Sequence, residues 1–160
     1  MIDKFARYVQ YEDIVTPVLS SELLDSINEI KTNFFQGDKL RHFGINPFSK
    51  ILFSGQSGCG KNLVARYLAK EMKLKFFQTK PEAFLGDPKQ IFENLRTILE
   101  AASETSNYLL YFEDYSESLN LYKKPKDWLQ LLLNEYNLHD GILIVEETTV
   151  DYYNHFSDKV

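Results

Sequence analysis

The residues best suited to chemistry form one short stretch in the first half of the chain. Residues 55–62 have the pattern G-x-x-x-x-G-K-N, which differs only in its last residue from the phosphate-binding pattern G-x-x-x-x-G-K-[ST]. Glycines let the backbone N–H groups of such a loop converge on phosphate oxygens, and Lys61 would reach the outer phosphates. The stretch, called here the phosphate-binding loop, predicts a nucleotide site. The residues expected to contact the nucleotide are Gly55, Gln56, Ser57, Gly58, Cys59, Gly60, Lys61, Asn62 and Leu63.

Asn62 stands where the usual Ser or Thr hydroxyl binds Mg²⁺. Its amide oxygen can approach a metal, but the side chain is bulkier than a hydroxyl and fits a tight octahedral Mg²⁺ shell less well. We therefore expect Asn62 to be a weak metal ligand. The alternative for the whole loop is a scaffold that has lost its ligand.

A second chemical feature is a pair of carboxylates after an apolar run. Residues 108–112 are all apolar or aromatic, and Glu113 and Asp114 follow them directly. A phosphate-binding loop needs an acidic partner at the end of another buried strand, which holds Mg²⁺ directly or through water. The pair is a candidate for that partner. The alternative is two solvated carboxylates at a surface turn.

Strands and helices alternate along the chain, which predicts an α/β fold: a three-layer sandwich with a parallel sheet and ligands at the carboxyl ends of the strands. We expect residues 1–19 to be mixed and turn-prone. Ser20 and Asp87 are expected helix caps. One face of the first helix is expected to hold Leu23, Leu24, Ile27, Ile30 and Phe34, and the residues expected to face inward from the second are Leu63, Val64, Tyr67, Leu68 and Met72. The expected strands span 51–53, which is expected to be fully buried, 75–78, 108–112 and 142–145; the expected helices span 21–35, 63–72, 88–102 and 128–136.

This order of loop, helix and acidic strand end resembles the AAA+ family of P-loop ATPases over roughly residues 11–158. The resemblance implies two parts: residues 1–20, an N-terminal segment bordering the nucleotide site, and residues 21–160, an AAA+-like α/β core. It implies ATP or ADP with Mg²⁺ as ligands. The fifth strand and the helical lid of the family are expected to be missing. With the family's strand order, 5-1-4-3-2, the strand before the phosphate-binding loop would lie at an edge of the sheet.

The resemblance also implies roles for single residues. Asp13 and Ile14 would border the adenine, and Thr148 would be the polar sensor residue after the last strand. In the family, the corresponding strand ends in Asp-Glu; the Asp organises the metal, and the Glu polarises the attacking water. Here the order is reversed, so Glu113 would be the metal carboxylate and Asp114 the catalytic one. Residues 84–86 (Phe-Leu-Gly) resemble a pore loop that grips a polypeptide, although we expect Phe84 to anchor a turn instead.

Composition limits the classes of partner and location. The net charge is −5, so no global basic field attracts nucleic acid. The single cysteine fits a reducing compartment, and from the residues given we expect neither a signal peptide nor a membrane-spanning segment. We expect a cytoplasmic protein that binds nucleotide and a protein partner or another copy of itself.

The departures from the family all affect catalysis. Asn62 lacks the hydroxyl, the two carboxylates are exchanged, and no arginine follows Arg96, so no arginine finger is expected. The favoured hypothesis is an ATP- or ADP-binding interaction module with weak, lost or partner-dependent hydrolysis. The alternatives are an active protein-remodelling ATPase completed by a partner, and a small P-loop kinase.

Overall fold

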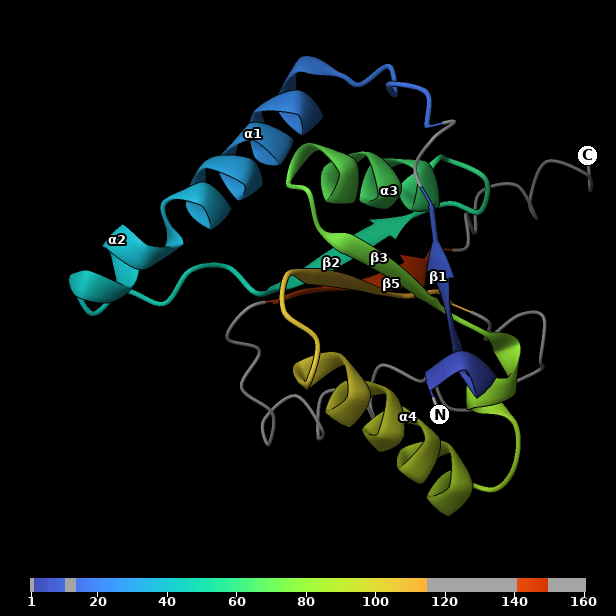
Figure 1. Cartoon of the computed structure of the whole chain (residues 1–160). Coiled ribbons are helices and arrows are strands. Elements are labelled where there is room, and N and C mark those ends of the chain that lie inside the picture. Colours follow the sequence, from blue (N-terminus) through green and yellow to red (C-terminus); the bar gives the residue numbers. More distant parts are fainter. Residues whose placement is uncertain (1, 11–13, 115–140, 150–160) are drawn as a thin grey trace, which may run out of the picture.

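A five-stranded sheet forms the middle layer of the described structure (Figure 1). The computed structural model describes residues 2–10, 14–114 and 141–149. The strands are β1 (Ala6–Val9), β2 (Lys50–Gly55), β3 (Lys75–Thr79), β4 (Tyr108–Phe112) and β5 (Gly141–Thr148). They lie in the order β1-β3-β4-β5-β2; the pairs from β3 to β2 are parallel, whereas β1 is antiparallel to β3. The predicted α/β class is therefore confirmed.

Helices cover both faces of this sheet. They are α1 (Ser21–Phe35), α2 (Gly37–His42), α3 (Lys61–Glu71) and α4 (Pro88–Ser103), with short 3-10 helices η1 (Ile2–Lys4) and η2 (Pro81–Phe84). In Figure 1, α3 and α1 lie over one face and α4 lies under the other, while α2 projects at the end of α1. The helix expected at 128–136 lies outside the described residues. No helix within the described ranges combines the length and apolarity needed to cross a membrane.

The two longest helices begin where the sequence predicts. The Ser20 hydroxyl accepts the N–H of Leu23 at 3.4 Å, and the Asp87 carboxylate accepts the N–H of Gln90 at 2.9 Å. Pro88 follows Asp87 at the first helical position, where a missing N–H costs nothing. These caps satisfy N–H groups that a helix leaves without intrahelical partners.

The sheet separates two apolar clusters. The cluster on the α4 face consists of Phe5, Ala83, Phe84, Ile91, Leu95, Ile98, Leu99, Ala102, Tyr108, Leu110, Phe112 and Leu143. The cluster on the α3 face consists of Ile27, Val64, Ala65, Leu68, Ala69, Met72, Leu74, Phe76, Leu109, Tyr111, Ile142 and Ile144. Alternate residues of β4 and β5 belong to opposite clusters, as the two-residue period of a strand requires.

Several local expectations are wrong. Residues 6–9 form a strand, and α2 was not predicted. β2 is not fully buried: among the described strands only β5 pairs with it, and Leu52 is 57% exposed. The expected edge position of β2 is thereby confirmed. The inward orientation expected for Leu63 is also wrong, because Leu63 is exposed. Leu23 and Leu24 are exposed as well, whereas Ile27 of the same expected helix face is buried.

Candidate functional site

The phosphate-binding loop connects the carboxyl end of β2 to the first turn of α3. Gly58 and Gly60 have φ angles of +76° and +92°, which residues with a Cβ rarely adopt, so glycine is required at both positions. Gly60 is the N-cap residue of α3, and no side chain caps this helix end. The first N–H groups of α3 therefore remain available to an anion, and the positive end of the helix dipole favours one.

Lys61 lies at the centre of the polar contacts around this loop. Its ammonium group donates to the carbonyl oxygens of Gly55 and Gln56 at 2.8 and 2.7 Å. A carboxylate oxygen of Glu146 lies 3.5 Å from the same nitrogen, and the Lys61 side chain is only 7% exposed. An ammonium has three hydrogens, and the Cys59 sulfur at 3.9 Å is the third acceptor beside the two carbonyl oxygens. Lys61 is thus a largely buried cation beside the loop.

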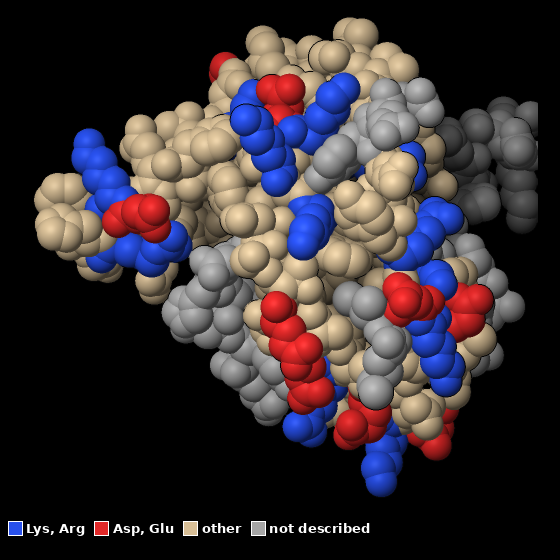
Figure 2. Space-filling model, viewed as in Figure 1, with Lys and Arg blue, Asp and Glu red and all other residues tan. Residues whose placement is uncertain are grey.

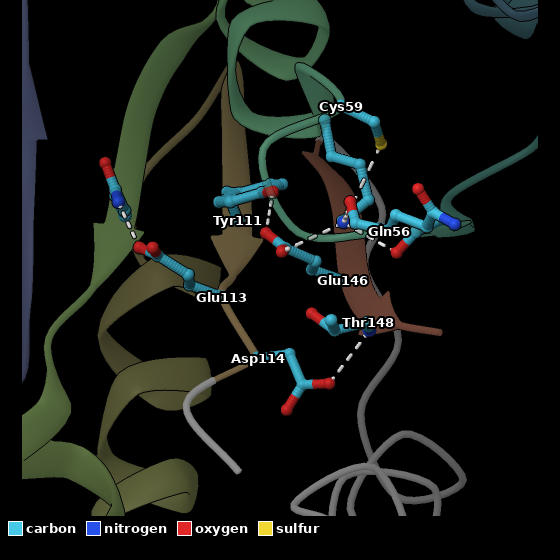
Figure 3. Close-up of polar contacts among 10 residues, drawn as sticks. Gln56, Cys59, Tyr111, Glu113, Asp114, Glu146 and Thr148 are labelled. Carbon is cyan, nitrogen blue, oxygen red and sulfur yellow. Dashed lines mark hydrogen bonds and ion pairs between the residues drawn. The ribbon is translucent and has the colours of Figure 1, made fainter. Parts of the chain in front are cut away.

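Glu146 is the acidic side chain next to Lys61, and the sequence interpretation did not assign it a role. It is part of β5, where it pairs in register with Phe53 of β2. The Tyr111 hydroxyl of β4 donates to its other carboxylate oxygen (Figure 3). The signal that would have identified Glu146 is the alternation along β5, because residues 142, 144 and 146 share the α3 face.

The two predicted carboxylates have other partners. Glu113 accepts a hydrogen bond from the side chain of Gln78 on β3, and its carboxylate turns away from Glu146 in Figure 3. The Glu113 N–H donates to the Thr79 hydroxyl at 3.2 Å. Asp114 accepts the backbone N–H of Thr148 at 2.9 Å. The metal and catalytic roles of Glu113 and Asp114 therefore remain predictions, and neither carboxylate has a described hydrogen bond to Lys61.

Of the remaining predicted site residues, one lies beside the phosphate-binding loop and another lies far from it. Thr148 pairs in register with Gly55, so it lies at the start of the phosphate-binding loop. The Ile14 carbonyl instead contacts Lys70 in the last turn of α3 at 3.5 Å. Lys70 is nine positions after Lys61 in the helix, which corresponds to a rise of about 13 Å. Ile14 is thus near the opposite end of the helix from the loop, and Asp13 lies outside the described residues.

Phe84 resembled the aromatic residue of a pore loop, but the turn-anchor alternative is confirmed. Its side chain is 1% exposed and belongs to the cluster on the α4 face. The amide of Asn94 on α4 donates to the neighbouring Ala83 carbonyl at 3.2 Å, which fixes the turn against the helix. In this structure Phe84 cannot contact a passing polypeptide.

The family assignment rests on a match to a family model. The model of the ATPase family associated with various cellular activities (AAA) matches residues 51–136, more than half of the chain. The match starts in β2 and includes the phosphate-binding loop and β4. Its last part, from residue 115 to residue 136, lies outside the described residues. The chain belongs to the AAA family. It is accordingly a nucleotide-binding α/β module.

Members of this family generally bind ATP or ADP with Mg²⁺, and the described residues fit the phosphate part of such a ligand. The uncapped end of α3, the two glycines with positive φ and the Lys61 ammonium together suit a polyphosphate. Within the described ranges, no group of three His, Cys, Asp or Glu side chains suitable for a metal occurs. Mg²⁺ usually keeps several waters and takes only one or two carboxylates, so this sparse donor set is compatible with it.

Proposed function

We propose that this AAA domain binds ATP or ADP and hydrolyses ATP slowly or not at all without a partner. The observation that supports it most directly is the uncapped N-terminus of α3 beside the buried Lys61 cation. The backbone of residues 58–62 would hold phosphate oxygens, and Lys61 would exchange one of its present acceptors for the outer phosphates. The bound state would then be reported to a partner instead of driving work.

Weak hydrolysis is supported by the groups around the loop. Asn62 has no hydroxyl for Mg²⁺. Glu113 accepts from Gln78 and Asp114 accepts from the backbone of Thr148, so in this structure each carboxylate is oriented by a contact within the sheet. Phosphoryl transfer depends on positioning, and small displacements of the activating group lower its rate strongly.

A protein partner is supported by the surface around α2. Phe35, Phe43, Ile45 and Phe48 are exposed although they are large and apolar; Phe43 is 68% exposed. Exposed apolar patches of this kind often mark protein-binding sites. On the face shown in Figure 2, acidic and basic side chains are interspersed, which suits a protein or a second copy better than a nucleic acid. The free Cys59 fits the reducing cytoplasm.

The binding proposal is tested by thermal unfolding with millimolar ATP or ADP and Mg²⁺. A ligand at 10–100 times its Kd stabilises the folded state by about 1.4–2.7 kcal/mol, which shifts the midpoint measurably. We expect this shift in the wild-type protein and its loss in Lys61→Ala, while Lys39→Ala on the distant α2 keeps it. The absence of any shift in the wild-type protein would contradict the proposal.

The hydrolysis proposal is tested by steady-state phosphate release from the purified chain. We expect release near background under conditions in which the thermal shift is saturated. Turnover of a few per second, about the usual range for an efficient phosphoryl-transfer enzyme, would instead support the active-ATPase alternative.

A further inference from the structure

The Lys61 ammonium donates to two carbonyl oxygens of the loop and forms an ion pair with a carboxylate. The Gly55 and Gln56 carbonyls accept at 2.8 and 2.7 Å, whereas the Glu146 oxygen lies 3.5 Å away, at the length of an ion pair. Glu146 is the most distant of these three oxygens and the only one that carries a full negative charge. Because its contact is the longest, an incoming phosphate oxygen could take its place beside Lys61 without breaking the two short hydrogen bonds.

Glu146 cannot leave the region when that exchange takes place. Its backbone is held in β5 between β4 and β2, and its second carboxylate oxygen accepts from the Tyr111 hydroxyl. Tyr111 is itself buried in the cluster on the α3 face. The Glu146 side chain is 13% exposed, so little solvent separates its charge from the loop. A phosphate bound by Lys61 would therefore meet a fixed, partly buried carboxylate.

The Glu146 carboxylate and a phosphate bound to the same lysine are both negative, and they repel each other strongly where water screens them incompletely. A divalent cation between the carboxylate and the phosphate converts this repulsion into attraction, and one or two carboxylates plus phosphate oxygens are the usual ligands of Mg²⁺. We propose that Glu146 makes nucleotide binding at this site dependent on a divalent cation, directly or through a bound water. This inference rests on the proposed nucleotide function and assigns its acidic partner to β5 instead of to the end of β4.

The orientation of Glu113 favours this assignment. Its carboxylate is engaged by Gln78 on β3, on the side of β4 away from β5 and β2 (Figure 3). Glu146 needs no rotation to face Lys61, because the contact between them already exists. The end of β5 therefore supplies a negative charge that is already in contact with the lysine of the phosphate-binding loop.

The test is a calorimetric titration of the full chain with ATP, once with Mg²⁺ and once with EDTA. The quantity to compare is the ratio of the two affinities. In Glu146→Gln we expect cation-free ATP to bind about tenfold more tightly than to the wild-type protein, and the Mg²⁺ enhancement to fall by at least a similar factor. Glu147→Gln is the matched control, because it removes the same charge one residue along on the opposite face of β5; its ratio should equal that of the wild-type protein.

Two further variants keep the test decisive. Tyr111→Phe leaves the carboxylate in place but removes the hydroxyl that holds it, so it should change the ratio in the same direction by a smaller factor. An unchanged ratio in Glu146→Gln, or a loss of Mg²⁺ enhancement confined to Glu113→Gln, would overturn the inference. No ATP binding by the wild-type protein in either titration would contradict the proposed function instead, so the two failures are distinguishable.

Discussion

The two faces of the sheet differ in how far their apolar packing continues. On the α4 face the packing is apolar from the middle of the sheet to the turn at Phe84 and to Phe5 near the start of the chain. On the α3 face the apolar cluster ends at Tyr111, beyond which lie Lys61 and Glu146. The α4 face is thus closed by hydrophobic side chains, and the α3 face ends in the candidate site.

The α4 face therefore contributes mainly to stability, whereas the polar end of the α3 face contributes mainly to the candidate binding site. The α4 face stabilises the domain through buried apolar area. The carboxyl end of the α3 face instead buries ionic and amide groups, and such groups add little net stability even when they are paired. Substitutions on the two faces should therefore have effects of different size and kind.

The largest expected effect on stability is on the α4 face. Phe84→Ala removes a fully buried aromatic ring from the cluster and should lower the free energy of unfolding by about 3–5 kcal/mol. Chemical denaturation of both proteins would measure the difference. Because such a loss is a large part of a typical domain's stability, Phe84→Leu provides a milder version with the same direction.

The neighbouring residue is the control for this prediction. Leu85 is 51% exposed, so Leu85→Ala should change the free energy of unfolding by less than about 0.5 kcal/mol. Equal losses in Phe84→Ala and Leu85→Ala would mean that the turn has a different position from the one described. The comparison between the two faces would then lose its structural basis.

A smaller effect is expected at the polar end of the α3 face, between Gln78 and Glu113. The Gln78 side chain is buried; its amide nitrogen donates to Glu113, and its oxygen accepts from Arg7 of β1 at 3.2 Å. Glu113→Ala removes one acceptor of a buried amide, which should cost about 1–3 kcal/mol. A double-mutant cycle with Gln78→Leu should give a coupling free energy of at least about 1 kcal/mol. Additive effects of the two changes would show that the contact contributes no stability.

Much of the fold followed from local patterns in the sequence. The signals for α1 and α4, a capping residue followed by a periodic apolar pattern, lie within each helix's own stretch of sequence. Ser20 and Asp87 therefore identified where these helices begin. β4 was recognised as a short, continuous apolar run followed by charged residues. In each of these elements, the residues that determine the structure are neighbours in the sequence.

The errors concern relations between distant segments. The apolar run of β2 suggested burial on both sides, but whether a strand is central or at an edge depends on its neighbours. β1 has only four residues, too few for a clear alternation, and it is stabilised by pairing with β3 more than sixty residues away. Glu146 faces Lys61 because β5 pairs with β2 in a register that no local pattern specifies. The phosphate-binding loop was therefore predictable from its own residues, whereas alternation along β5 could place Glu146 on the α3 face but could not place it beside Lys61.

The smallest expected effect concerns the attachment of α1 to the α3 face. Lys31 of α1 and Glu71 of α3 form an ion pair at 2.8 Å, and Ile27 is the buried residue of α1. The hydrogen bond to Glu71 raises the pKa of Lys31 above its ordinary value of 10.5, and the Glu71 charge adds to this effect, while desolvation opposes it. Because the pair is partly exposed, Lys31→Met should cost less than about 1 kcal/mol at pH 7.

The dependence of this cost on pH identifies its origin. A lysine pKa that is higher in the folded state than in the unfolded state stabilises the fold fully below the unfolded value, and this stabilisation disappears as the pH rises through the folded value. The difference in unfolding free energy between wild type and Lys31→Met should therefore stay constant from pH 7 to about 10 and shrink above that. Lys39→Met removes the same charge from the exposed surface of α2 and controls for the change in net charge. A cost in Lys31→Met that persists unchanged at high pH would indicate that the aliphatic part of Lys31, and not its charge, holds α1 against the site-bearing face.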